Sequence, residues 1–314
     1  MKKKRKELIL MKLIPFGSTG ESVPAVALGC MRLTRLSEEE AKTYVRTALE
    51  LGANFFDHAD IYGGGECESL FGRAVRGIPR EKLLIQSKCG IVPGKRYDFS
   101  KKHILNSVDG ILKRLGVEYL DSLLLHRPDA LMEPEEVAEA VAALLESGKI
   151  RHFGVSNQNP AQMELLEKYL PAPITANQLQ LSLTNASMIS QGMEVNMATP
   201  GAVARDGYVL DYCRLHGITI QPWSPFQYGM FEGVFLGSEK FPALNAAIDA
   251  LAAKYGVTPV TVTVAWLLRH PAKFQPIVGS MNLSRVREAI AASDLVLTRQ
   301  EWYNLYLAAG NVLP

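Results

Sequence analysis

The chain has 314 residues, of which 47% are hydrophobic and 21% are charged, the balance of a soluble globular protein. Its formal net charge of +2 is too small to indicate a nucleic acid or an acidic partner. No run approaches the roughly 20 apolar residues of a membrane-spanning helix, so we expect neither nucleic-acid binding nor membrane insertion.

The cysteine pattern indicates neither a metal site nor a disulfide framework. The cysteines are far apart in the sequence and form no CxxC pair. This spacing argues against a zinc knuckle and fits the reducing cytoplasm, where we expect the protein to lie. Each thiol is expected to be a small buried or pocket-lining residue rather than a reactive group. They are Cys30, Cys67, Cys89 and Cys213.

The chain begins with a basic run and then alternates strand and helix patterns. Lysine or arginine occupies every position from 2 to 6, and we predict that residues 1–11 form a flexible tail. Residues 12–26 are predicted to form a hairpin that turns at 17–20. Short apolar runs predict strands at 26–29, 54–56, 83–87, 120–125, 152–156, 174–178, 217–223 and 274–279. Periodic patterns predict helices at 38–51, 101–115, 134–147, 160–169, 208–215, 242–255, 259–269 and 283–292.

Strands that alternate with helices along a single domain, residues 1–314, predict one closed (β/α)8 TIM barrel. The competing fold is an open doubly wound sheet, which usually carries GxGxxG after its first strand when it binds a dinucleotide. That motif is absent, and the glycines at 63–65 lack its spacing. We expect the N-terminal hairpin to close the bottom of the barrel. The long connection at 181–205 is expected to be functional because of its length.

Polar or aromatic side chains recur where the predicted strands end. In a (β/α)8 barrel the active site lies at the C-terminal ends of the strands. Residues at these positions on successive strands are therefore expected to share one site. They are Asp57, Lys88, His126, Ser156, Asn157, Gln178, Trp223, Gly279 and Ser280.

Four residues at or near these strand ends have the chemistry needed to reduce a carbonyl. Asp57 and Lys88 are expected to form a buried ion pair, which is a weak source of stability but tunes a third group. Tyr62 has an unperturbed pKa of about 10, and we expect the Lys88 ammonium to lower it toward the range of a general acid. His126 is expected to hydrogen-bond and orient the substrate carbonyl. No side chain supplies a hydride, so a cofactor is required.

Each of these residues taken alone has an ordinary structural interpretation, as a turn former, a rim aromatic, a solvated charge or a core histidine. Their shared placement at the strand ends favours a catalytic site. A metal site built from Asp57, His58, Asp60 and His126 is an alternative. Lys88 would repel a cation there, and we expect no metal.

Four ordered motifs resemble the aldo-keto reductase superfamily, and the resemblance extends over residues 13–314. They are Asn-Phe-Phe-Asp-His-Ala-Asp-Ile-Tyr-Gly at 54–63, Ser-Lys-Cys-Gly at 87–90, Leu-Leu-His-Arg-Pro at 124–128 and Gly-Val-Ser-Asn at 154–157. Two further runs, His-Arg-Pro-Asp at 126–129 and Trp-Leu-Leu-Arg-His-Pro-Ala at 266–272, are similar to a bacterial subfamily of predicted oxidoreductases. The resemblance implies a catalytic tetrad of Asp57, Tyr62, Lys88 and His126, the same four residues that the chemistry selects.

The resemblance also implies NADPH or NADP bound across the top of the barrel without a Rossmann fold. Ser156, Asn157 and Gln178 are implied to bind the carboxamide. Trp223 stands where many members stack a tyrosine on the nicotinamide. The turn at 279–285 is implied to hold the 2′-phosphate, but Gly279 replaces a lysine of many members, which leaves NADH possible. The other implied cofactor residues are Ser224, Phe226, Ser280, Asn282, Arg285 and Glu288.

The expected function is reduction of aldehydes or ketones to alcohols, with Tyr62 as the general acid and a small-molecule carbonyl compound as the partner. One alternative is an NADPH-binding sensor subunit that regulates another protein. Another is a barrel enzyme of a different class that acts on phosphorylated sugars. The sequence does not predict the oligomeric state. Loops set specificity in this fold, and the candidate substrate-pocket residues are Met31, Tyr97, Arg127, Met197 and Tyr228.

Overall fold

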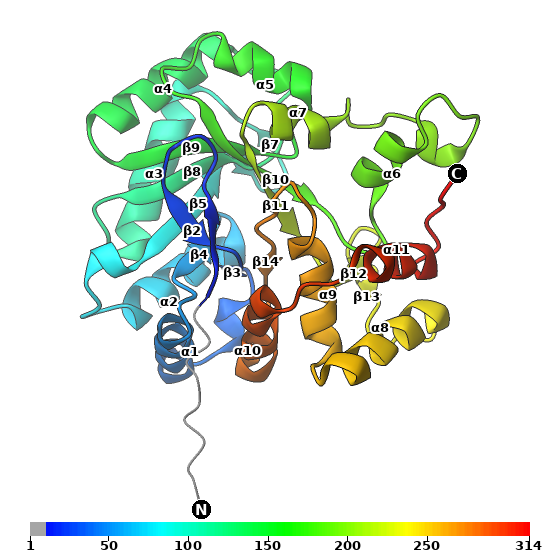
Figure 1. Ribbon diagram of the computed structural model, residues 1–314. Coiled ribbons are helices and arrows are strands. Elements are labelled where there is room, and N and C mark those ends of the chain that lie inside the picture. Colours follow the sequence, from blue (N-terminus) through cyan, green and yellow to red (C-terminus); the bar gives the residue numbers. More distant parts are fainter. Residues whose placement is uncertain (1–10) are drawn as a thin grey trace, which may run out of the picture.

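The computed structural model describes residues 11–314, which form a parallel eight-stranded barrel surrounded by helices (Figure 1). The strands follow the order β11-β10-β9-β8-β5-β4-β3-β14, and every hydrogen-bonded neighbour pair is parallel. The prediction of a (β/α)8 barrel is therefore confirmed. The barrel strands are β3 (Ala27–Gly29), β4 (Phe55–Asp57), β5 (Leu84–Cys89), β8 (Leu120–Leu125), β9 (Ile150–Ser156), β10 (Ile174–Gln180), β11 (Thr219–Trp223) and β14 (Ile277–Val278).

The barrel is nearly closed, and its seam lies between β11 and β14. β14 has only two residues and pairs with β3, so the seam has no regular ladder. A backbone hydrogen bond of 3.1 Å from the Gln275 N–H to the Ile220 carbonyl crosses it instead. Side chains from opposite strands fill the interior, as expected for a barrel of this size.

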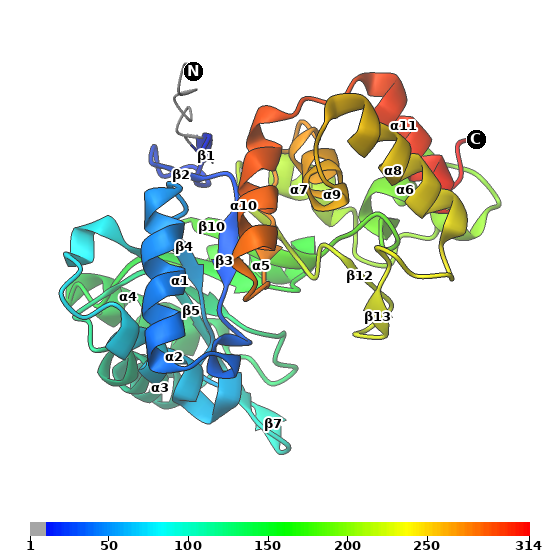
Figure 2. The same ribbon diagram turned by 90° about the horizontal axis from the view of Figure 1, so that it is seen from below.

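The N-terminal hairpin closes the bottom of the barrel, as predicted. Its strands are β1 (Leu13–Pro15) and β2 (Ser22–Pro24). The backbone N–H of Gly17 in the turn donates to Thr219 Oγ1 at 2.7 Å, where β11 begins. Only glycine fits here, because φ is +54° and a Cβ would lie 2.6 Å from the Thr175 carbonyl oxygen. In Figure 2 this hairpin lies at the opposite end of the molecule from the β7 and β13 hairpins.

Helices pack around the outside of the barrel, and local capping residues explain where some of them begin and end. The capping box of Ser37 and Glu40 is present at the first helix, and Gly116 ends the third in a left-handed conformation with φ of 66°. The helices are α1 (Glu38–Glu50), α2 (Glu66–Ala74), α3 (Lys101–Leu115), α4 (Pro134–Glu146), α5 (Pro160–Glu167), α6 (Ser187–Met193), α7 (Val209–Leu215), α8 (Pro242–Tyr255), α9 (Pro259–Leu268), α10 (Leu283–Ala291) and α11 (Arg299–Ala308).

Several elements differ from the prediction. Three helices, α2, α6 and α11, were not predicted, and α6 lies within the connection 181–205 that was expected to be a loop. Two hairpins were also missed, β6 (Ile91–Val92) with β7 (Arg96–Tyr97) and β12 (Gln227–Tyr228) with β13 (Gly233–Val234). Met11 was predicted to belong to the flexible tail, but its side chain is buried because it packs against Gly52. The basic run at 2–6 lies outside the described residues.

No single helix among residues 11–314 has the length and apolar composition needed to cross a membrane. The helices α8 and α9 reach that length and composition only when taken together, and they are bent 95° from each other.

Candidate active site

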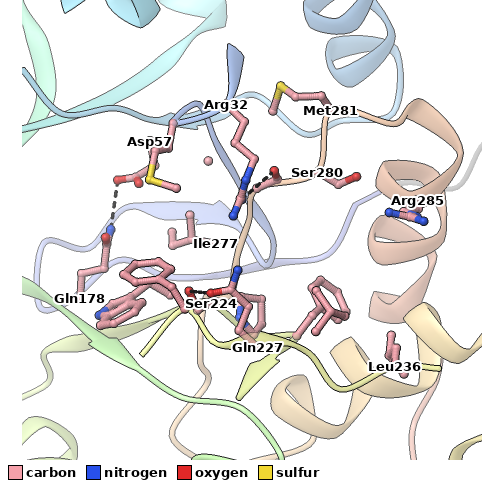
Figure 3. A pocket seen from close by; sticks show the side chains of 18 of the residues that line it. Arg32, Asp57, Gln178, Ser224, Gln227, Leu236, Ile277, Ser280, Met281 and Arg285 are labelled. Atoms are coloured by element: carbon pink, nitrogen blue, oxygen red, sulfur yellow. Dashed lines mark hydrogen bonds between the residues drawn. The ribbon is translucent and has the colours of Figure 1, made fainter. Parts of the chain in front are cut away.

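A cavity of about 1240 Å³ opens at the C-terminal end of the barrel. The predicted residues Asp57, Tyr62 and His126 line one end of it, and Arg285 lines the other. Figure 3 shows Asp57 and Gln178 on one side and Arg285 and Leu236 on the other. Its walls come from the strand ends, the segment that follows β11 and the turn before α10. The cavity is therefore long as well as deep.

The Asp57 and Lys88 side chains form the predicted ion pair in the floor of this cavity. The Lys88 ammonium lies 2.8 Å from both carboxylate oxygens and donates to the His58 carbonyl at 2.7 Å. Lys88 is fully buried and Asp57 nearly so. Burial opposes the charge on Lys88, but Asp57 and Tyr62 outweigh that effect and raise the pKa of the ammonium above its usual value. Lys88 is therefore a permanent cation in the working pH range.

Glutamine side chains inside the barrel also hold Asp57. Asp57 Oδ1 accepts a hydrogen bond of 2.7 Å from Gln86 and one of 3.0 Å from Gln178. These hydrogen bonds continue into the barrel interior, where Gln86 donates to Gln221 at 2.9 Å and Gln221 donates to Gln275 at 2.8 Å. These hydrogen bonds between side chains fix the orientation of the buried Asp57 carboxylate.

Sequence reasoning missed Gln86, Gln221 and Gln275, although a signal was present. Gln86 precedes Lys88 by two positions and Gln221 precedes Trp223 by two. Because side chains alternate along a strand, a polar residue two positions before a site residue points to the same face. A buried glutamine in an otherwise apolar strand therefore indicates a polar barrel interior.

Tyr62 lies beside Lys88, but its pKa is not lowered as the sequence analysis expected. Its hydroxyl oxygen is 3.5 Å from the Lys88 ammonium, which directs its shorter hydrogen bonds to Asp57 and His58. Burial raises the pKa of the Tyr62 hydroxyl above its usual value, and Lys88 only partly offsets the shift. The expectation of a lowered pKa is corrected for this ligand-free protein. Tyr62 holds its proton, and Lys88 stabilises the phenolate that donation would leave.

His126 is a neutral imidazole next to Tyr62. Burial, followed by the charges of Lys88 and Arg127, lowers the pKa of His126 to about 2. Its ring meets the Tyr62 ring edge-on, with centroids 5.9 Å apart, and its Nδ1 is buried without a hydrogen-bond partner among residues 11–314. A neutral imidazole offers one N–H donor and one acceptor. The two side chains are thus placed to donate to the same oxygen atom.

The residues predicted to bind a carboxamide form one connected group. Trp223 Nε1 donates to Asn157 Oδ1 at 3.1 Å, Asn157 Nδ2 donates to Ser156 Oγ at 2.7 Å, and Ser156 Oγ donates to the Gln178 carbonyl at 3.0 Å. The indole of Trp223 is thereby fixed at the cavity wall. An ionised carboxylate can only accept hydrogen bonds, so the Gln178 side chain must point its amino group at Asp57. Its amide oxygen is then left for a ligand.

The other end of the cavity is cationic. Asn282 caps α10 by accepting from the backbone N–H groups of Ser284 and Arg285 at 2.8 and 3.3 Å, and the Arg285 side chain is exposed at this helix start. Arg32, which was not predicted, reaches across from the segment after β3 and lies 3.5 Å from the Gly279 carbonyl oxygen (Figure 3). A Cβ at position 279 would lie 3.1 Å from the Arg32 guanidinium. Glycine at 279 therefore leaves room for this cation.

Besides the fully buried Lys88, four predicted site residues do not line the cavity. Tyr97 is exposed on the β6–β7 hairpin, and Met197 is exposed within the 181–205 connection. The Tyr228 ring packs on the Phe241 ring instead, with centroids 5.1 Å apart. Glu288 accepts from Thr258, the N-cap residue of α9, and from Ser284. The predicted residues that do line it, besides those described above, are Met31, Arg127, Ser224, Phe226, Gly279 and Ser280.

The structure offers no support for the metal alternative. No group of three or more histidine, cysteine or acidic side chains among residues 11–314 is arranged to hold a metal ion. The His58 ring packs against Phe71 with centroids 4.5 Å apart and does not line the cavity. All four cysteines are buried and unpaired within the described residues. Burial raises the pKa of Cys30 and Cys89 well above the usual value, so these thiols stay protonated and unreactive.

Asp60 makes protein stability depend on pH. Burial, with a contribution from Glu68, raises the pKa of the Asp60 carboxyl to about 7. The unfolded chain loses this proton near pH 4, so the folded state binds more protons between these values. The stability that protonated Asp60 contributes is consequently lost as the pH rises from about 4 to about 7.

We expect the unfolding free energy of Asp60→Asn, which cannot lose a proton, to rise relative to that of the wild type by about 2–4 kcal/mol between pH 5 and pH 8.5. Urea unfolding of both proteins at the two pH values measures this. A difference between the proteins that is the same at both values would contradict it.

Comparisons with known proteins agree with this geometry. The sequence model described as the Aldo/keto reductase family matches residues 25–306. The protein named uncharacterized oxidoreductase YcsN of Bacillus subtilis (strain 168) is 38% identical over 285 residues, which cover 87% of this chain and 89% of that protein. The 6-dehydroglucose reductase of Agrobacterium fabrum is 33% identical over 285 residues, with the same two coverages of 87% and 89%.

A solved structure is also similar over nearly the whole chain. It is an aldo-keto reductase from Klebsiella pneumoniae in complex with NADPH, with a TM-score of 0.75 and 26% sequence identity. The match covers 94% of each chain.

Proposed function

The chain belongs to the aldo/keto reductase family, and from this premise we propose that it is an NADP-dependent enzyme that reduces aldehyde or ketone carbonyls to alcohols. The observation that carries the proposal is the group of Tyr62, His126 and the Lys88–Asp57 ion pair at one end of a single long cavity. A proton donor, a neutral carbonyl-binding imidazole and a buried cation are what such a reduction requires.

The residues along the cavity fit NADPH. The Trp223 ring offers an apolar face for the nicotinamide, and Asn157 and the free oxygen of Gln178 offer hydrogen bonds for its carboxamide. At the far end, Arg32 and Arg285 offer cations for phosphate groups. The glycine at 279 keeps this passage open. When bound, NADPH supplies the hydride that the protein itself lacks.

The chain's own residues account for the proton and for the placement of the carbonyl. Tyr62 and the neutral His126 donate hydrogen bonds to the carbonyl oxygen and polarise the C=O bond. Tyr62 then gives its proton to the oxygen as the alcohol forms, and Lys88 stabilises the phenolate. Asp57 keeps Lys88 charged and in place. The balanced reaction is carbonyl + NADPH + H⁺ → alcohol + NADP⁺, with the proton returned to Tyr62 from solvent.

The test is NADPH oxidation with a panel of neutral aldehydes, ketones, quinones and methylglyoxal, with the alcohol products identified by mass spectrometry. We expect one alcohol to form for each NADPH consumed. Tight NADPH binding without turnover on any member of the panel would instead favour the sensor subunit.

Arg285 is proposed to bind the 2′-phosphate that distinguishes NADPH from NADH. We expect Arg285→Met to raise the dissociation constant of NADPH by about 10- to 100-fold, as loss of a charge-assisted hydrogen bond predicts, and that of NADH by less than about 3-fold. Fluorescence titration measures both constants. Arg287→Met is the matched control, because Arg287 is exposed on the same helix and does not line the cavity. An equal effect of Arg285→Met on the two cofactors would contradict the assignment.

A further inference from the structure

Arg127 is a charged side chain at the reactive end of the cavity that forms no ion pair within residues 11–314. It follows His126 directly, lines the cavity and is partly buried. Among residues 11–314 it makes no salt bridge and no side-chain hydrogen bond. The acid nearest in sequence, Asp129, instead accepts from the backbone N–H groups of Phe99 and Leu131, both at 2.9 Å. The Arg127 guanidinium carbon lies 5.4 Å from the centre of the Trp223 ring.

The other charged groups on the cavity wall do not neutralise Arg127. Asp57 is paired with Lys88. The other acid that lines the cavity, Asp249, is on α8 with Asn245 and not at the end that holds the tetrad. Arg32 and Arg285 flank the turn around Ser280, where the phosphates of a dinucleotide are proposed to lie. Arg35 also lines the cavity, in the short helix Leu33–Arg35 that follows Arg32. Arg127 is therefore the cation next to His126 that neither a cavity acid nor a proposed phosphate contact accounts for.

A guanidinium that is partly removed from water gains from an anionic partner. We propose that Arg127 selects carbonyl substrates that carry an anionic group, a carboxylate or a phosphate ester, close to the carbonyl. The inference rests on the proposed reductase function and names its substrate class. His126 and Arg127 both line this part of the cavity, so the atoms next to the carbonyl of a substrate oriented by His126 would lie within reach of Arg127. The guanidinium fork suits two parallel hydrogen bonds to either anion.

Matched substrate pairs test this proposal. The pairs are succinic semialdehyde with butanal, 4-carboxybenzaldehyde with 4-methylbenzaldehyde, and glyceraldehyde 3-phosphate with glyceraldehyde. The first two pairs report on a carboxylate and the third on a phosphate. We expect the wild type to prefer the anionic member of at least one pair in kcat/KM. In Arg127→Met that preference falls by about 10- to 100-fold, while the neutral member changes by less than about 3-fold.

Two further variants make the outcome specific. Arg127→Lys, which keeps the charge, should retain part of the preference, and Arg287→Met, which removes an exposed charge elsewhere, should retain all of it. The proposal is overturned if the wild type prefers the neutral member of every pair. It is also overturned if Arg127→Met lowers turnover of both members of a pair equally, because a structural role would do that.

A binding measurement separates this proposal from the reductase function itself. Calorimetric titration of the NADP⁺ complex with succinate and with inorganic phosphate should give binding in the wild type that weakens at least about 10-fold in Arg127→Met. If no aldehyde is reduced but this difference is seen, the reductase function fails and the anion site stands. If aldehydes are reduced and no anion binds through Arg127, the substrate class is overturned and the reductase function stands.

Discussion

Tyr62→Phe is expected to lower the turnover number for carbonyl reduction by at least about 100-fold and up to about 10,000-fold, the range for loss of a general acid. In the proposed mechanism the phenol proton is the one that the alcohol oxygen receives, and neither His126 nor Lys88 can replace it. His126 is neutral because its pKa is about 2, and the Lys88 ammonium is bound to Asp57 and His58. The ring itself stays in place, so NADPH affinity should change by less than about 3-fold.

Stopped-flow reduction of a neutral aldehyde and fluorescence titration with NADPH measure the two quantities separately. Tyr169→Phe is the matched control, because Tyr169 is exposed at the end of α5, far in sequence from the tetrad, and does not line the cavity. Turnover by Tyr62→Phe within 10-fold of the wild type would show that another group donates the proton.

Lys88→Met is expected to impair both catalysis and stability. The substitution leaves the Asp57 carboxylate buried with only the amide donors of Gln86 and Gln178. Removing one partner of a buried ion pair typically costs about 3–5 kcal/mol. Without the ammonium, the Tyr62 phenolate is also unsupported, so turnover should fall at least about 100-fold. Urea unfolding and steady-state kinetics measure the two effects.

The double variant Asp57→Asn/Lys88→Met separates stability from function. It removes the uncompensated charge, so we expect it to recover most of the unfolding free energy lost in Lys88→Met, because neutral replacements for a buried pair are often tolerated. Its turnover should stay as low as that of Lys88→Met. Recovery of activity together with stability would mean that the ion pair has only a structural role.

The barrel and the position of Asp57, Lys88 and His126 at the strand ends were predictable because both depend on local patterns. Each buried strand is a short apolar run, and Asp57, Lys88 and His126 each stand where such a run ends. The helix α2 was missed because it follows Gly63, Gly64 and Gly65, whose φ values of 59°, 65° and 95° belong to a tight turn. In the sequence alone, a run of glycines indicates a loop rather than the start of a helix.

The missed helix α11 did carry a local signal. Thr298 and Glu301 form a capping box at its start, a pattern that is visible in the sequence as Thr-x-x-Glu before an apolar face. The helix was therefore predictable from the residues.

The state of Tyr62 was not predictable, because it depends on distances in three dimensions. The sequence places Lys88 near Tyr62 but does not reveal that Asp57 and His58 take the shorter hydrogen bonds of the ammonium. The cations Arg32 and Arg35 were missed for a similar reason. They follow β3 in a segment without a motif, and only the closed barrel brings them to the cavity wall, with Arg32 beside Gly279.

The central claim is that this cavity transfers a hydride from NADPH to a carbonyl carbon while Tyr62 protonates the oxygen. Incubation of the wild type and Tyr62→Phe with benzaldehyde and NADPH that carries deuterium at the transferred position of C4 tests it most directly. The wild type should yield benzyl alcohol with one deuterium on the carbinol carbon for each NADP⁺ formed, and Tyr62→Phe should bind the cofactor and yield almost none. Benzyl alcohol without deuterium, or equal deuterium transfer by both proteins, would contradict the account.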